Sequence, residues 1–235
     1  MKILFIRHGD PDYEHDTLTP KGWKEAKLLS DRLVKLDVHA FYCSPLGRAK
    51  DTAGVTLNRL HRRAEVLDWL QEFPAQVTDP EDGGKKVAWN FLPSYWTKHA
   101  GLYDKDKWFL DPIMQTGNTG EIYKHVVCGI DGLLEKYGYK RSGMIYRTTG
   151  GNKYTIVMFC HFGVELVILS HLLGISAPAL WQGFFTAPTS VTSVVTEERK
   201  KGEVYFRCSA LGDTSHLYLG GEPVSDSGLF QETYD

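Results

Sequence analysis

The sequence predicts an α/β fold, a three-layer sandwich in which helices cover both faces of a mostly parallel central sheet. Short apolar segments without a repeating pattern, typical of strands buried on both faces, alternate with segments of helical periodicity. Near the C-terminus, residues 191–196 and 204–208 flank a Lys-Lys-Gly turn and predict an antiparallel hairpin. A chain of 235 residues can bury a substantial core without disulfides, so one domain over residues 1–235 is expected.

Two β-loop-α units are expected at the start of the chain. Residues 2–6 predict a buried strand, and Thr19-Pro20 predicts the first turn of a helix whose apolar residues follow at helical spacing. Residues 40–43 predict a second strand. The turn at Ser44-Pro45 leads into a second helix that carries Arg48 in its first turn.

The middle of the chain is rich in aromatic residues and lacks a regular period from about residue 73 to residue 119. The aromatic side chains there include Trp89, Phe91, Tyr95, Trp96, Tyr103, Trp108 and Phe109. The stretch is too aromatic for a flexible linker and too irregular for one long helix, so we expect a small helical cap or lid inserted into the domain. Before it, residues 65–70 predict a third strand that runs into Glu72.

The second half returns to alternating elements. A helix is expected from Gly120 to Tyr137, with Gly138 suited to the position just past its end. Residues 154–160 form the strongest predicted strand of the chain. This strand ends at His161, and an apolar helix follows at once, as in the layout around His8.

Composition excludes several classes of partner. The formal charge of −2, with 27 basic and 29 acidic residues, provides no extended basic surface, so no nucleic-acid ligand is expected. The four cysteines are widely scattered and fit buried thiols in a reducing compartment. No segment has the length of a signal-peptide core or a membrane span, so a cytoplasmic protein that binds no membrane is expected. No cofactor is implied.

Polar residues follow three of the predicted strands. The first strand leads to Arg7 and His8, the second to Arg48, and the strongest to His161. Because ligands of α/β sheets bind beyond the carboxyl ends of the strands, we expect these four side chains to meet there. Such a cationic cluster would repel itself without an anion, and guanidinium groups match the oxygens of a phosphoryl group. The sequence therefore predicts a phosphate site.

This set of residues is sufficient for covalent phosphoryl transfer without a metal. A neutral imidazole, that of His8, can attack phosphorus, while Arg7, Arg48 and His161 stabilise charge on the transferring oxygens. The leaving alkoxide needs a proton, which a carboxyl group beside apolar surface can supply. Glu72, at the end of the third predicted strand, fits this role, and Glu81 is the second candidate. Each residue alone is weak evidence, and their order and placement together carry the prediction.

Several segments also resemble the histidine phosphatase superfamily, which includes the cofactor-dependent phosphoglycerate mutases. They are ILFIRHGDPDY, DTLTPKG, FYCSPLGRAKDTA, VMFCHFGVELVILSHLLG and, near the C-terminus, DTSHL. The resemblance runs from residue 2 to about residue 217 outside the aromatic insert. It implies the same fold and a phosphohistidine at His8 without a metal. It further implies phosphate contacts from Arg7, Arg48 and His161, and a proton donor at Glu72.

Departures from the family pattern bear on the reaction. Phe162 stands where many members have glycine, and Glu14 where many have asparagine. The mutases carry an RHGESxWN-like opening and an RFTGW-like segment, whereas this chain reads RHGDPDYEHDTLTPKGW, which favours hydrolysis of a small phosphorylated substrate over mutase-type transfer. The aromatic insert could form an apolar wall that suits a bulky or planar substrate, or equally a separate core or a homodimer surface.

Other functions remain as alternatives. His8, Asp10, Asp12 and His15 lie within one short stretch and could instead hold a metal ion. Asp10-Pro11-Asp12 also has a faint likeness to aspartate-nucleophile phosphatases, although it lies past the strand end. A non-catalytic module that binds a phosphorylated ligand is the third alternative, because a fold alone does not establish activity.

Overall fold

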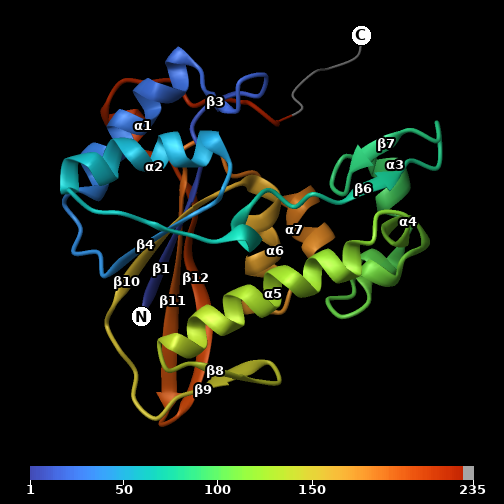
Figure 1. Cartoon of the computed structure of the whole chain (residues 1–235). Helices are drawn as coiled ribbons and strands as arrows, with labels where there is room; N and C mark the ends of the chain where they lie inside the picture. The colour runs from blue at the N-terminus through green and yellow to red at the C-terminus, as the bar shows by residue number, and fades with distance from the viewer. Residues whose placement is uncertain (230–235) are drawn as a thin grey trace.

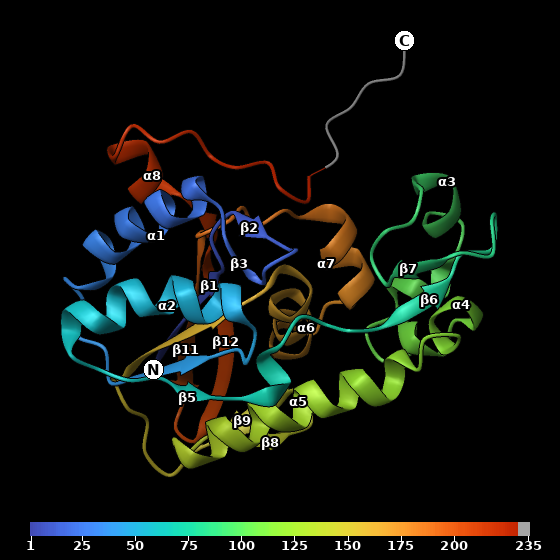
Figure 2. The same cartoon turned by 45° about the horizontal axis from the view of Figure 1, so that its top comes forward.

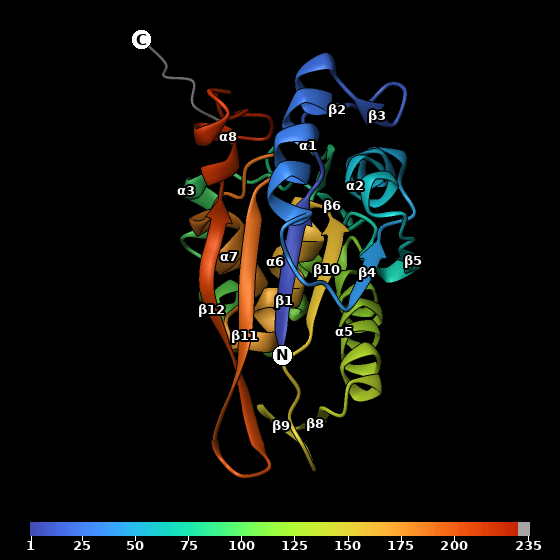
Figure 3. The ribbon, with the colours of Figure 1, turned by 90° about the vertical axis from the view of Figure 1, so that its left-hand side faces the viewer.

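The computed structural model describes residues 1–229 and is built around an eight-stranded sheet (Figure 1). In spatial order its strands are β5 (Glu65–Val66), β4 (Ala40–Cys43), β10 (Thr155–Cys160), β1 (Lys2–Arg7), β11 (Val191–Lys200), β12 (Glu203–Asp213), β9 (Ile145–Arg147) and β8 (Lys140–Ser142). The first four run parallel, and β11 runs antiparallel to β1 (Figure 3). The predicted α/β class and terminal hairpin are confirmed, and the hairpin β11–β12 is longer than predicted.

Helices cover both faces of the sheet. On one face lie α1 (Pro20–Leu33) and α2 (Gly47–Leu60), and on the other lie α5 (Thr119–Lys136), α6 (Phe162–Leu173) and α7 (Ala177–Gly183). Side chains of β1 alternate between the two: Leu4 and Ile6 pack in the core with α1 and α2, while Ile3 and Phe5 pack in the core with α5 and α6. A short helix, α8 (Ser215–Leu219), packs beside α1.

Helix ends follow the expected capping chemistry. The side chain of Thr19 accepts a hydrogen bond from the Gly22 N–H at the start of α1, and Pro20 occupies the first turn. The C-terminal end of α6 is closed by Gly174 in the left-handed conformation, with φ of 70°. Ser176 caps α7 in the same way as Thr19 caps α1, with proline in the first turn, although the sequence pattern did not predict this helix.

The predicted third strand over residues 65–70 is wrong in most of its length. Only β5 pairs with the sheet, and a 3₁₀ helix, η1 (Asp68–Leu70), follows it. The chain must turn there, because Val66 is exposed on the edge strand whereas Leu70 is fully buried in the core. A strand would hold these two side chains, four residues apart, on the same face. The small hairpin β8–β9 was not predicted either.

The aromatic insert forms a compact cap at the N-terminal end of α5 (Figure 2). It consists of the hairpin β6 (Gln76–Thr78) and β7 (Lys85–Val87), the short helices α3 (Pro93–Trp96) and α4 (Pro112–Gln115), and the 3₁₀ segments η2 (Ala100–Tyr103) and η3 (Trp108–Leu110). Trp108 is fully buried, with its ring edge-on to Trp181 and Tyr123 at centroid distances of 5.4 Å each. Part of the aromatic content therefore serves to attach the cap to α5 and α7.

The segment after α8 returns across the start of α1 toward the end of β1 (Figure 2). Lys21 Nζ donates to Glu222 Oε1 at 2.9 Å, and the Ser225 hydroxyl donates to a carboxylate oxygen of Asp10. This path brings Ser227 beside Arg7. Within residues 1–229, no helix combines the length and apolar character needed to cross a membrane.

Candidate active site

His8 and His161 meet because their strands are neighbours in register. In the parallel pairing of β1 with β10, Arg7 lies opposite Cys160, so the next residue of each strand leaves the sheet at the same level. The His8 N–H donates to the Cys160 carbonyl at 3.1 Å. The two imidazole centroids lie 5.1 Å apart, and the residues are only 2% and 0% exposed. The predicted convergence of these two histidines is present.

Hydrogen bonds favour one tautomer for each ring. Nδ1 of His8 lies 2.7 Å from the Gly9 carbonyl, which can only accept, so Nδ1 carries the proton and Nε2 keeps a free lone pair. Nε2 of His161 lies 2.7 Å from the hydroxyl of Ser44, which also accepts from the Leu46 N–H. The hydroxyl can therefore donate to His161, which leaves the Nδ1 proton of that ring as a donor without a partner among the described residues.

Both histidines are held neutral. Burial lowers the pKa of His8 well below its ordinary value, and the nearby charges of Arg7 and Arg48 lower it further. Burial also lowers the pKa of His161 well below 6.5, with additional contributions from His8 and the two arginines. A neutral imidazole with a free nitrogen is the form that can act as a nucleophile.

Arg7 is buried and oriented by backbone carbonyls. Its Nη1 donates to Thr186 O at 2.6 Å and its Nη2 to Ser227 O at 2.9 Å, while Nε has no partner within the part of the chain that is described. The guanidinium also lies 5.6 Å from the ring centroid of Phe162 and 5.5 Å from that of Phe185. Each Nη keeps one further hydrogen, so three N–H groups of Arg7 remain for an anion.

Arg48 lies in the first turn of α2, where Asp16 positions it. One carboxylate oxygen of Asp16 accepts from Arg48 Nη1 at 2.6 Å, and the other accepts from the Gly47 N–H at 2.6 Å. The ring of Tyr13, which is exposed, lies 5.5 Å from the guanidinium carbon. Asp16 and Tyr13 both belong to the loop after β1, so this loop brings Arg48 toward the histidines.

Thr52 connects the loop after β1 to α2. Its Oγ1 accepts from the Gly9 N–H at 2.9 Å and donates to the Arg48 carbonyl at 2.7 Å. Asp16, Ser44 and Thr52 were not among the predicted site residues. Their sequence signal is weak, because each is a common polar residue whose role appears only when separate segments meet.

Glu72 lies at the start of α6, the helix that directly follows His161. Its Oε1 accepts from the N–H groups of Phe73 at 2.8 Å and Val164 at 3.1 Å. Burial raises the pKa of this carboxyl, although the backbone N–H groups and Arg7 oppose the shift. Glu81, the second candidate, lies exposed in the turn between β6 and β7. The geometry therefore favours Glu72 as the proton donor.

A second buried carboxyl, Glu165, lies behind the site in the first turn of α6. It is fully buried, and neither carboxylate oxygen has a hydrogen-bond partner within residues 1–229. Burial raises its pKa to about 7, although a contact with Thr192 and the charge of Arg7 oppose the shift. No motif in the sequence points to this residue, which sits inside an apolar helical run.

Replacing Glu165 with glutamine is expected to stabilise the protein at pH 8 and to change little at pH 5. The folded state holds this proton more tightly than the unfolded chain, so stability falls as pH rises from about 4.5 through about 7. The loss corresponds to on the order of 3 kcal/mol in the free energy of unfolding. Urea titrations of Glu165→Gln and of the exposed control Glu81→Gln at both pH values would measure it. Equal changes at the two pH values would contradict this account.

The residues of the alternative metal site do not converge. Asp12 and His15 pair with each other in an exposed loop, Asp10 binds Thr19 and Ser225, and His8 is buried. Across residues 1–229, no group of three or more histidine, cysteine, aspartate or glutamate side chains is placed to hold a metal ion. Glu14 is exposed and points its backbone N–H at Asp12.

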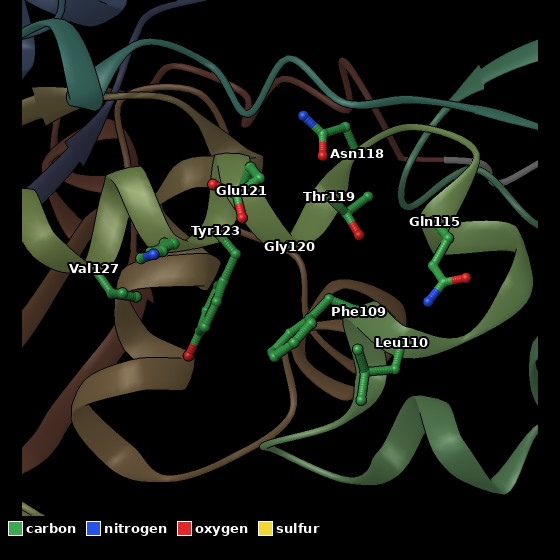
Figure 4. A pocket seen from close by; sticks show the side chains of 10 residues that line it. Phe109, Leu110, Gln115, Asn118, Thr119, Gly120, Glu121, Tyr123 and Val127 are labelled. Carbon is green, nitrogen blue, oxygen red and sulfur yellow. The ribbon is translucent and has the colours of Figure 1, made fainter.

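A cavity of about 560 Å³ lies between the cap and α5, apart from the two histidines (Figure 4). Phe109 and Tyr123 stack in its wall with ring centroids 5.5 Å apart. Thr119, at the start of α5, contributes a buried hydroxyl that lacks a partner among the residues described. None of the predicted site residues lines this cavity.

Comparisons with known proteins agree with the geometry. The model of the histidine phosphatase superfamily (branch 1) matches residues 3–80, a span that contains Arg7, His8, Arg48 and Glu72. A protein of Schizosaccharomyces pombe named "Probable phosphatase" is 24% identical over an alignment 234 residues long, and the match covers 92% of this chain and 95% of that protein.

Solved structures share the fold at low identity. A phosphoserine phosphatase of Entamoeba histolytica, in complex with phosphoserine, is 18% identical with a TM-score of 0.60, covering 92% of this chain and 98% of that one. A mycobacterial glucosyl-3-phosphoglycerate phosphatase, in complex with inorganic phosphate, is 17% identical with a TM-score of 0.62 and the same coverage. Residues 3–80 are thus similar to the histidine phosphatase superfamily, and over most of its length the chain shares the fold of these two phosphatases.

Proposed function

We propose that the protein is a phosphatase that hydrolyses a small phosphomonoester through a phosphohistidine intermediate on His8. The observation that carries this proposal is the convergence of two neutral, buried imidazoles with the Arg7 guanidinium at adjacent strand ends and with the Arg48 guanidinium at the start of α2. A phosphoryl group would relieve the repulsion between the arginines and would use the N–H groups that have no partner within residues 1–229, including Nε of Arg7 and Nε of Arg48.

In the first step, the Nε2 lone pair of His8 attacks phosphorus while the bond from phosphorus to the ester oxygen breaks. The leaving oxygen takes the proton of Glu72, whose raised pKa keeps the carboxyl protonated to higher pH than an ordinary glutamate. Arg7, Arg48 and the Nδ1 proton of His161 stabilise the charge that develops on the equatorial oxygens.

In the second step, water attacks the phosphohistidine. Glu72, now a carboxylate, accepts a proton from the water as the new phosphorus–oxygen bond forms and the phosphorus–nitrogen bond breaks. Inorganic phosphate leaves, and His8 regains its neutral state. Neither step uses a metal, so we expect turnover to persist in the presence of a chelator.

Hydrolysis is favoured over mutase-type transfer. The three relatives are described as phosphatases, and the loop after β1 has the sequence that departs from the mutase pattern. Mutase-type transfer would require a second hydroxyl acceptor held beside the phosphohistidine.

The test combines trapping with a product screen. Wild-type protein mixed with a ³²P-labelled ester and quenched is expected to carry acid-labile, alkali-stable phosphate, as phosphohistidine does. A screen of metabolite phosphoesters with EDTA present, including 3-phosphoglycerate and its bisphosphate, is expected to release free phosphate. Transfer to a second glycerate without net release would favour the mutase alternative, and loss of turnover that Mg²⁺ or Zn²⁺ restores would favour the metal alternative.

A further inference from the structure

The organic part of the substrate must lie on the Glu72 side of the site, if the proposed function holds. Glu72 is the proposed donor to the ester oxygen, so that oxygen and the group it carries must approach this carboxyl. What surrounds Glu72 therefore determines which leaving group fits.

Trp89, from the cap, lies directly beside Glu72. A methyl group built on Gly163 would lie 2.4 Å from Cζ3 of Trp89 and 2.7 Å from Oε1 of Glu72. The indole edge and the carboxylate therefore both pack against the Cα of Gly163. Only glycine fits there. Gln182 Nε2 donates to the Trp89 carbonyl at 2.8 Å, and the Trp181 ring lies 5.7 Å away, which fixes the position of the indole.

Phe162 extends this aromatic surface to the phosphate site. It follows His161 directly, and its ring centroid lies 6.0 Å from that of Trp89 and 5.6 Å from the guanidinium carbon of Arg7. Phe185 continues the surface, with its ring centroid 6.3 Å from that of Phe162 and 5.5 Å from the guanidinium carbon of Arg7. Trp89 and Phe162 are both partly exposed, so each presents some ring surface to solvent.

The composition of this surface discriminates between leaving groups. A sugar or glycerol phosphate carries hydroxyl groups that need hydrogen-bond partners, and the nearby amide of Gln182 already binds the Trp89 carbonyl. A flat aromatic group instead loses little on desolvation and gains offset or edge-on contacts with the rings.

We propose that Trp89 and Phe162 form a leaving-group subsite that selects aryl phosphomonoesters, in which the phosphate is esterified to an aromatic hydroxyl. The indole lies beside the ester oxygen as Glu72 protonates it, and Phe162 lies between the leaving group and the Arg7 guanidinium. Phe162 thus provides an aromatic ring beside Arg7, which a glycine at the same position would not provide.

The test compares kcat/KM for phenyl phosphate and β-glycerophosphate in the wild type, Trp89→Leu and Phe162→Leu. The intrinsic reactivity of each ester cancels when the ratio of the two substrates is compared between variants. We expect each substitution to lower the ratio of phenyl to glycerol ester by about tenfold, as the loss of an aromatic contact of about 1.4 kcal/mol would. Trp89→Phe should retain most of the preference. Tyr103→Leu, which changes an exposed aromatic residue of the same cap, should leave the ratio unchanged.

Binding gives a second measurement that does not depend on turnover. Phenylphosphonate should compete better than methylphosphonate with wild-type protein, and Phe162→Leu should remove that advantage. An unchanged ratio in folded Trp89→Leu and Phe162→Leu, or equal affinity of the two phosphonates for the wild type, would overturn the aryl subsite while leaving the phosphatase intact. Absence of labile phosphate on wild-type protein would instead overturn the proposed function.

Discussion

Replacing His8 with alanine is expected to lower kcat/KM by at least about 10³-fold on every ester that the wild type hydrolyses. The free Nε2 of His8 is the only proposed nucleophile, and its tautomer is fixed by the Gly9 carbonyl. Arg7, Arg48 and His161 would still bind phosphate in the variant. The measurement is phosphate release from p-nitrophenyl phosphate, together with trapping of acid-labile phosphate.

A surface histidine provides the matched control. His125 is exposed on α5, so His125→Ala should keep wild-type activity and wild-type labelling. Circular dichroism and thermal unfolding would establish that His8→Ala is folded. Activity of folded His8→Ala within tenfold of wild type, or labile phosphate on that variant, would exclude His8 as the nucleophile. Retained binding of phosphate without turnover in the wild type would favour the binding-module alternative.

Glu72→Gln is expected to lower kcat/KM, which reports the first step and not the hydrolysis of the phosphohistidine, by about 10²- to 10³-fold on alkyl phosphates and by much less on p-nitrophenyl phosphate. An alkoxide needs a proton in order to leave, whereas p-nitrophenolate leaves without one. Glutamine keeps the size of the side chain and its oxygen can still accept from the Phe73 and Val164 N–H groups, so the loop should stay in place. Glu81→Gln is the control, and equal losses on both substrates would argue against a proton donor at Glu72.

The pH dependence of kcat/KM provides an independent test of Glu72 as the proton donor. The protonated form of Glu72 is active in the first step, so kcat/KM for an alkyl ester should be retained below the pKa of Glu72 and lost as pH rises through it. Because burial raises that pKa, the falling limb should lie above the ordinary range of a glutamate, and it should disappear in Glu72→Gln. The rising limb from His8 should lie well below pH 6.5.

The sequence predicted the parts of the site that depend on strand ends. Arg7 is the last residue of β1, and His8 and His161 immediately follow β1 and β10. Because neighbouring parallel strands end at one edge, the approach of these residues follows from the fold class. The roles assigned to these residues stay predictions until the variants are measured. The prediction of a third strand over residues 65–70 was wrong because the chain turns into the core after β5. Its last apolar residue, Leu70, is buried by η1 and does not extend the sheet.

Contacts between distant segments could not be predicted in the same way. Asp16 binds Arg48 across 32 positions, and Trp89 approaches Glu72 only because both pack against Gly163. Neither contact leaves a periodic pattern or a motif in the sequence. The aromatic richness of the cap could be seen in the sequence. Which aromatic residues are buried and attach the cap, as Trp108 does, and which lie beside Glu72 depends on the packing of α5, α6 and α7.

The two imidazoles owe their spacing to the backbone ladder between β1 and β10, which lies outside the cap in the sequence. Trp89 of the cap lies beside Glu72. Of the two residues of the proposed leaving-group subsite, Phe162 directly follows His161, whereas Trp89 belongs to a separate portion of the polypeptide. With the proposed role of Trp89, exchanges between β6 and α4 would alter which esters are accepted while the strand ends stay unchanged, so a new specificity would not require a new arrangement of His8 and His161.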